Sequence, residues 1–255
     1  MGQLFQYTTF KILGFSLFKD GGETHHWNYW TPVCERSLNN VISNHTHFYA
    51  TNNNLEVAKI AFSSCIWMDD PAANSEFATI FWKHVRNFGP DLWLWLGDNA
   101  YDSTDHFNET DNTWDEGTIR LEYNKVRDHP SYVKYGLVAE SDGKKIPVMA
   151  TWDDHDAGTY DDDGDWDNND SGSEERCLIM NQDEFVNHFN IPKDDPMNKD
   201  FVGNRQFGVY NSRMFLRPGT TEPGIQVIML DTRSGRDNTI KVLSYIYIYI
   251  YIYIK

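Results

Sequence analysis

Four titratable residues stand in a row at Asp153, Asp154, His155 and Asp156, directly after Trp152. The row follows the apolar run 146–151, so its first members are expected at the edge of a core rather than on a polar surface. Carboxylates crowded at such a place repel one another and partly protonate unless cations are present. The row therefore predicts metal coordination by Asp153 and Asp154. His155 could be a metal ligand or a catalytic acid that protonates a leaving alkoxide.

A second candidate, Asp98, follows another apolar run within Leu94-Trp-Leu-Gly-Asp98-Asn-Ala-Tyr101-Asp102. Gly97 allows a sharp turn after a strand, and a carboxylate placed there can bridge two cations. The plainer interpretation is an aspartate that caps the turn. The row at 153–156 shifts the preference to a metal ligand.

Cys65 ends a third apolar run, beside Ser63 and Ser64. A buried and inert cysteine is the commoner case. Its position at a strand end makes a thiolate ligand plausible, and bulk properties do not decide between the two.

The acidic run 161–170 invites comparison with a calcium-binding EF loop. With Gly164 in the sixth position, the first and last positions would be Thr159 and Asp170, and neither is the expected residue. A solvated acidic loop near the site is the better interpretation.

Apolar runs and helical periodicity alternate along the chain. Strands are predicted at 57–64, 91–96, 146–151, 205–216 and 225–230, and helices at 74–88, at about 115–138 with a break near Pro130, and at 174–189. This order predicts an α/β layered fold with a mainly parallel sheet. Ligands of such folds gather beyond the carboxyl ends of the strands, where Cys65, Asp98 and Asp153 are expected.

The composition restricts the class of protein. With 255 residues, 40% of them hydrophobic, the chain is long enough for one sizeable domain. A net charge of −16 argues against a nucleic-acid-binding surface. No run approaches the roughly 20 apolar residues of a membrane helix, so no transmembrane segment is expected. The three cysteines are not a disulfide scaffold. Sequons at Asn44, Asn108 and Asn169 permit a secretory route, and the compartment stays open.

The motifs resemble one known family when they are taken together. Phe62-Ser-Ser-Cys65, Leu96-Gly-Asp-Asn-Ala-Tyr101, Thr151-Trp-Asp-Asp-His-Asp156 and Leu230-Asp-Thr-Arg233 resemble the PhoD-like (alkaline phosphatase D) branch of the calcineurin-like metallophosphatases, from about residue 57 to 237. The resemblance implies a four-layer α/β/β/α sandwich that hydrolyses phosphate monoesters or diesters, with iron and calcium at its site.

The resemblance also implies roles for individual residues. Cys65 and Tyr101 would bind Fe³⁺, and Asp98 would bridge Fe³⁺ and Ca²⁺. Asp153 or Asp154, with His155, would lie at the second metal or at the phosphate. Asn99 would contact the substrate. Where the family has a metal-binding asparagine this chain has Tyr160, so Asp161 is the candidate replacement.

The resemblance has a further consequence for the extent of the domain. The family continues to a later Gly-Asp-x-His-type segment with further metal ligands, and this chain as written lacks it. We therefore expect an incomplete sandwich, truncated in its C-terminal half. Two functions stay open: hydrolysis of phosphate esters, possible only if the remaining ligands suffice, and a non-catalytic acidic protein that binds calcium or a partner.

The expected organisation has three parts. Residues 1–55, rich in Asn, His, Thr and aromatics, are predicted to be an irregular lead-in, and 56–240 to be the metallophosphatase part. Residues 241–255 include perfect Tyr-Ile alternation over 245–254, which a repeated TA dinucleotide encodes. We expect this low-complexity tail to come from an intron or a gene-model error. As protein it would be prone to aggregation.

Overall fold

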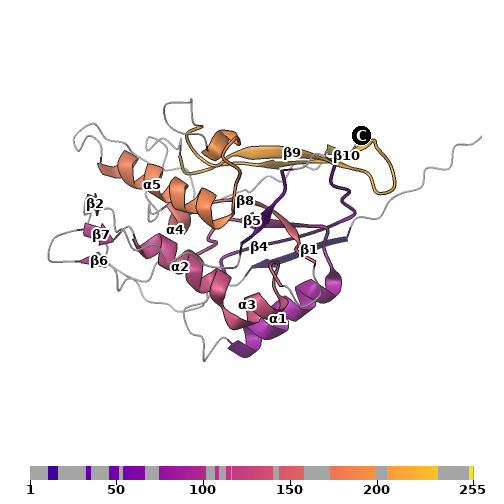
Figure 1. The fold of residues 1–255 in the computed structure, drawn as a ribbon, viewed down its shortest axis with the longest axis horizontal. Coiled ribbons are helices and arrows are strands. Elements are labelled where there is room, and N and C mark those ends of the chain that lie inside the picture. The colour runs from indigo at the N-terminus through magenta and orange to yellow at the C-terminus, as the bar shows by residue number, and fades with distance from the viewer. Residues whose placement is uncertain are drawn as a thin grey trace, which may run out of the picture.

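The computed structural model describes residues 11–16, 33–35, 46–51, 54–66, 75–101, 107–108, 113–115, 117–139, 144–157, 173–198, 206–234 and 253–254. These residues form a mixed α/β fold built on a parallel sheet (Figure 1). The sheet has five strands in the order β1-β4-β5-β8-β3, and all its pairings are parallel. The strands are β1 (Lys11–Ser16), β3 (Phe48–Tyr49), β4 (Lys59–Ser64), β5 (Leu92–Leu96) and β8 (Pro147–Thr151).

Helices connect the parallel strands, as parallel pairing requires. α1 (Ser75–Phe88) lies between β4 and β5, and α2 (Gly117–Asp128) and α3 (Pro130–Tyr135) lie between β5 and β8. The short α4 (Asp154–Ala157) begins just after β8, and α5 (Ser173–His188) follows it. The 3₁₀ helix η2 (Pro196–Asn198) comes next. β2 (Val33–Glu35), β6 (Phe107–Asn108) and β7 (Thr113–Asp115) form a separate small sheet.

The residues of β5 show how the layers form. Trp93 and Trp95 point to the helical side, where they belong to one buried cluster, whereas Leu92, Leu94 and Leu96 belong to the other. This is the period of two that a strand imposes, and both faces are buried, so the sequence is uniformly apolar.

A second, antiparallel sheet covers the leucine face. It consists of β9 (Asn211–Leu216), β10 (Pro223–Met229) and β11 (Tyr253–Ile254), in the order β11-β10-β9. Ile225, Val227 and Met229 alternate along β10 and pack into the same cluster as Leu94 and Met149 of the parallel sheet. The described chain therefore has three layers, with helices α1 to α3 on one face of the parallel sheet and β9–β10 on the other (Figure 1).

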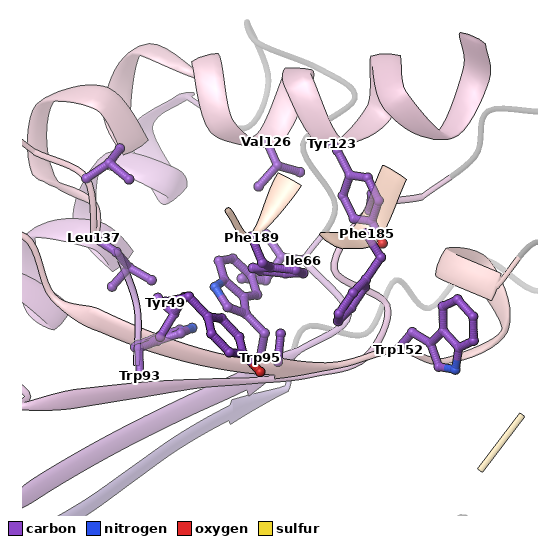
Figure 2. Close-up of a cluster of buried hydrophobic side chains, with 14 of the residues drawn as sticks. Tyr49, Ile66, Trp93, Trp95, Tyr123, Val126, Leu137, Trp152, Phe185 and Phe189 are labelled. Atoms are coloured by element: carbon purple, nitrogen blue, oxygen red, sulfur yellow. The ribbon is translucent and has the colours of Figure 1, made fainter. Parts of the chain in front are cut away.

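Large aromatic side chains fill the space between the parallel sheet and the helices (Figure 2). Trp82 of α1 packs against Trp93, Trp95 and Tyr132, with ring centroids 4.6–6.1 Å apart. Phe185 and Phe189 join the cluster from α5 and its C-terminal end, with centroids 4.7 Å apart. These side chains are 0% exposed, so this face supplies much of the hydrophobic stabilisation.

Most predicted elements are confirmed. The strands predicted at 57–64, 91–96, 146–151 and 225–230 are β4, β5, β8 and β10, each within about two residues of the predicted bounds. The helix break at Pro130 separates α2 from α3. The strand predicted at 205–216 begins only at Asn211, and Asp115, predicted to open a helix, lies in β7.

The prediction of an irregular lead-in missed the strands in 1–55. β1, β2 and β3 all lie in this range, and β1 pairs with β4 along its whole length. These strands are short and find their partners far along the chain, so local periodicity does not reveal them. In the tail, Tyr253 and Ile254 pair with β10, which does not bear on the origin of the repeat. No helix in the described part of the chain is long and apolar enough to cross a bilayer.

Two buried histidines join the segment before β3 to the helices. His47 Nδ1 lies 2.9 Å from the carbonyl oxygen of His188, and Nε2 lies 2.7 Å from the hydroxyl of Tyr132. A carbonyl can only accept, so Nδ1 carries the proton of a neutral ring and Nε2 accepts from Tyr132. The rings of His47 and His188 lie 4.7 Å apart, with Trp95 and Phe189 also in contact with His47.

The histidine pair predicts acid-sensitive stability. Burial lowers the pKa of His47 from 6.5 to about 4, and it lowers the pKa of His188 as well. A histidine whose folded pKa is depressed takes up its proton in the unfolded state first, so stability is lost as the pH falls from 6.5 towards 4. We expect His47 to account for roughly 2 kcal/mol of stability lost between pH 7.5 and 5.

The comparison with His47→Gln isolates this contribution. Burial raises the pKa of Asp98 to about 6, which gives a dependence of opposite sign, because protonation of a buried carboxylate favours the folded state. That dependence is present in both proteins and cancels in the difference. Urea unfolding at each pH should show a shallower loss of stability in His47→Gln, and equal slopes would refute the assignment.

Candidate metal centre

Three neighbouring strands end at the candidate site. β4, β5 and β8 lie side by side in the sheet, and all run in the same direction. Cys65 follows β4, Asp98 follows β5, and Asp153 and Asp154 follow β8. The carboxyl ends of parallel strands meet at one edge of a sheet, so the topology brings these residues together as expected.

Asp98 is the centre of the group. Its Oδ2 accepts hydrogen bonds from Cys65 Sγ at 3.4 Å and from the Tyr101 hydroxyl at 3.1 Å. Its Oδ1 is buried and accepts no hydrogen bond from the residues that the structure describes. A thiol, a phenol and a carboxylate thus meet at one point, with a carboxylate oxygen still available.

The backbone at this point adopts conformations that are uncommon for residues with side chains. Cys65 and Asp98 both have positive φ, 56° and 48°, directly after their strands. The Ile66 N–H donates to the Asp98 carbonyl at 3.2 Å, so the two loops hold each other. Such strain persists only where the surroundings determine it, and it clusters at functional sites.

Gly97 allows the β5 and β8 loops to approach. Its φ is 104°, and a Cβ placed there would lie 2.7 Å from the Cβ of Asp153 and 3.0 Å from its backbone nitrogen. The sharp turn predicted at this glycine is therefore present. It is required for close approach as well as for direction.

Burial holds the donors of this group towards their neutral forms. Burial is the largest cause of the raised pKa of Asp98, about 6, followed by the charge of Asp154. Burial likewise raises the pKa values of Cys65, Tyr101 and Asp153. A bound cation would reverse this preference, so the donor set fits a metal ion.

Asp98, Asp153 and Asp154 each offer one oxygen, and these ligand atoms lie within 4.8 Å of one another. This buried and half-buried group could hold a metal ion. Cys65 and Tyr101 lie beside this group and offer a thiol and a phenol as further donors.

Arg233, which was not among the predicted site residues, contacts two of these carboxylates. It follows β10, its Nε donates to Asp153 Oδ1, and its Nη2 donates to Asp154 Oδ1 at 3.1 Å. The side chain is 4% exposed. The sequence feature that could have identified Arg233 is a basic residue just after an apolar strand, in the segment Leu230-Asp-Thr-Arg233.

Asp156 is a structural anchor that the site prediction also left out. It is 0% exposed and accepts from the backbone nitrogens of Asn99 and Asp153 and from the Tyr123 hydroxyl. Burial raises its pKa well above the usual value. It thereby ties the loops after β5 and β8 to α2.

Asn99 takes part in the same anchor. Its amide donates to the Thr151 carbonyl at 2.8 Å and to Asp156 Oδ2 at 3.2 Å, and the residue is 1% exposed. The sequence placed Asn99 at the substrate. In the structure its side chain joins the loops that follow β5 and β8. Contact of Asn99 with a substrate stays a prediction.

Two predicted site residues remain, His155 and Asp161, and the structure describes only the first of them. His155 lies on α4 with its ring 4.4 Å from the ring of Tyr101, so it is beside the group that surrounds Asp98. Asp161 lies outside the described residues.

Comparisons of this chain with protein-family models, with curated proteins and with solved structures found no match. What the fold and the site define is a mixed α/β protein with acidic residues at the carboxyl edge of its parallel sheet that could hold a metal ion.

Proposed function

We propose that this chain is a metal-dependent hydrolase of phosphate esters, of the PhoD-like type that its motifs resemble. The observation that supports this most is the meeting of Cys65 and Tyr101 on one oxygen of Asp98, beside Asp153 and Asp154. Core packing alone gives no reason for a thiol, a phenol and three carboxylates to gather at the ends of three apolar strands. Hydrolysis of an anionic ester does give one.

The proposed roles follow from donor chemistry. Cys65, Asp98 and Tyr101 would hold iron, and when bound the ion would activate water and stabilise charge on the phosphoryl oxygens. His155, beside Tyr101, would protonate the leaving alkoxide. Asp156, with Asn99, would keep the two loops in register by its buried hydrogen bonds.

The layers agree with the proposed class of fold. An α/β/β/α sandwich has helices, a sheet, a second sheet and further helices. The helical layer, the parallel sheet and the β9–β10 sheet would be its first three layers. The resemblance also implies metal ligands from a later segment, so metal binding and turnover are separate properties to measure.

A non-catalytic, cation-binding protein is the second candidate. The observation in its favour is the group Asp98, Asp153 and Asp154, whose ligand atoms lie within 4.8 Å of one another and could hold an ion without any reaction. A cation-binding protein needs the loops but no access for an ester.

Hydrolysis assays distinguish the two candidates. Purified protein loaded with iron and calcium should hydrolyse 4-nitrophenyl phosphate or bis(4-nitrophenyl) phosphate, and chelation should abolish the activity. His155→Gln should lower kcat by about 100-fold or more with unchanged metal content, because a proton donor contributes that much. The matched control is His84→Gln on α1, away from the strand ends. Metal binding without any hydrolysis would contradict the enzyme proposal and favour the second candidate.

A further inference from the structure

Arg233 makes a two-pronged contact inside the candidate metal centre. Its Nε and Nη2 donate to Oδ1 of Asp153 and Oδ1 of Asp154, so the guanidinium lies between the two carboxylates. All three side chains are largely buried, at 4% exposure for Arg233 and 15% for each aspartate. Planar guanidinium suits such paired recognition of carboxylates, and it keeps its charge at any pH a protein meets.

The backbone that carries Arg233 is held in place. Asp231 Oδ1 accepts from the backbone nitrogens of Arg233 and Ser234, both at 2.9 Å. Asp231 Oδ2 accepts from the Val209 nitrogen and the Ser234 hydroxyl, both at 2.7 Å. A Cβ at Gly208 would collide with this carboxylate, so the turn fits closely against the start of β9. The guanidinium is therefore a fixed part of the site rather than a loose surface charge.

We infer that Arg233 takes the place of a second metal ion, so that the site holds one ion instead of an iron and calcium pair. An ion bridging Asp153 and Asp154 would compete with the guanidinium for the same carboxylate oxygens and for the space between them. Two-metal sites place their ions only about 3.5–4 Å apart, which leaves no room for an arginine between the ligands of one of them. The fixed positive charge also repels a further cation at that distance.

The donors for the one remaining ion are those that meet at Asp98. Cys65 Sγ and the Tyr101 hydroxyl meet at Asp98 Oδ2, and Asp98 Oδ1 accepts nothing from the described residues. The Arg233 guanidinium donates to Asp153 and Asp154, so its charge is directed at these two carboxylates. The donors around Asp98 thus keep the composition of an iron site. Asp153 and Asp154, which would bind the second ion, are instead neutralised by Arg233.

This inference rests on the metal site of the proposed function but not on turnover. The test is the number of ions per chain, measured by elemental analysis after dialysis against iron and calcium, together with Ca²⁺ titration by calorimetry. The parent chain should retain close to one iron and bind Ca²⁺ weakly. Arg233→Gln should bind Ca²⁺ at least about tenfold more tightly, because two buried carboxylates lose their counter-charge. Arg217→Gln, on an exposed arginine paired with Glu222, is the matched control and should leave both values unchanged.

Each outcome decides the inference. Two ions per parent chain, one of them calcium, would overturn it without touching the proposed function. Unchanged or weaker Ca²⁺ binding in a folded Arg233→Gln would also overturn it. If the parent binds one ion and Arg233→Gln gains Ca²⁺, but neither protein hydrolyses a phosphate ester, the proposed function fails and the inference stands. Should Arg233→Gln not fold, the ion count of the parent decides alone.

Discussion

Asp98→Asn is expected to weaken iron binding by at least about 100-fold, and any phosphate-ester hydrolysis with it. The Asp98 carboxylate contacts both Cys65 and Tyr101, at 3.4 and 3.1 Å. An amide of the same size keeps the shape but removes the negative charge that a cation needs, and even indirect partners of metal ligands cost 10–100-fold when lost. Competition with a metal-sensitive chelating dye measures the affinity.

The effect on folding has the opposite sign. Asp98 is buried and its pKa is raised to about 6, so its charged form is unfavourable in the metal-free chain at neutral pH. Metal-free Asp98→Asn should therefore be at least as stable as the parent to urea at pH 7.5. Glu222→Gln, on a side chain 70% exposed, is the control for loss of one negative charge and should bind iron normally. Iron binding at parental strength in Asp98→Asn would remove Asp98 from the site.

Gly97→Ala is expected to destabilise the metal-free protein by about 4 kcal/mol. Alanine at φ 104° is strained by about 1–3 kcal/mol, and its Cβ would lie 2.7 Å from the Cβ of Asp153, which adds a steric cost of similar size. The β5 and β8 loops must move apart to accept it, so metal affinity should fall as well. Urea unfolding and the chelator competition measure the two effects.

Gly219→Ala separates backbone strain from crowding. Gly219 also has a positive φ, 71°, but a Cβ there meets nothing within 4 Å. Its substitution should cost about 1 kcal/mol and leave metal binding unchanged. Equal costs at the two glycines would show that the two loops are not in close contact at Gly97.

The strand ends were predictable because each apolar run is long enough to identify a buried strand. Residues 92–96 are continuously apolar since both faces of β5 are covered, and this pattern located Asp98 without any knowledge of the fold. The same pattern cannot tell which residues face helices and which face the second sheet. The alternation of Trp93 and Trp95 with the leucines became visible only in the packing.

The contacts between residues within the site could not be predicted from the sequence as well as the strand ends could. Arg233 reaches Asp153 across 80 residues of chain and from another sheet, so no local spacing connects them. Asn99 was assigned to the substrate by its place in a motif, and its hydrogen bond to buried Asp156 is not visible in that motif. β1 escaped prediction because its partner β4 lies far along the chain.

The most direct test of the account is the visible absorption spectrum of the chain loaded with Fe³⁺. Phenolate and thiolate bound to ferric iron absorb visible light by charge transfer to the metal, whereas iron held by carboxylates alone does not. We expect a coloured protein with one iron per chain, whose absorption is altered in Cys65→Ser and weakened or lost in Tyr101→Phe. A colourless protein, or a spectrum that neither substitution changes, would contradict an iron site made by Cys65, Asp98 and Tyr101.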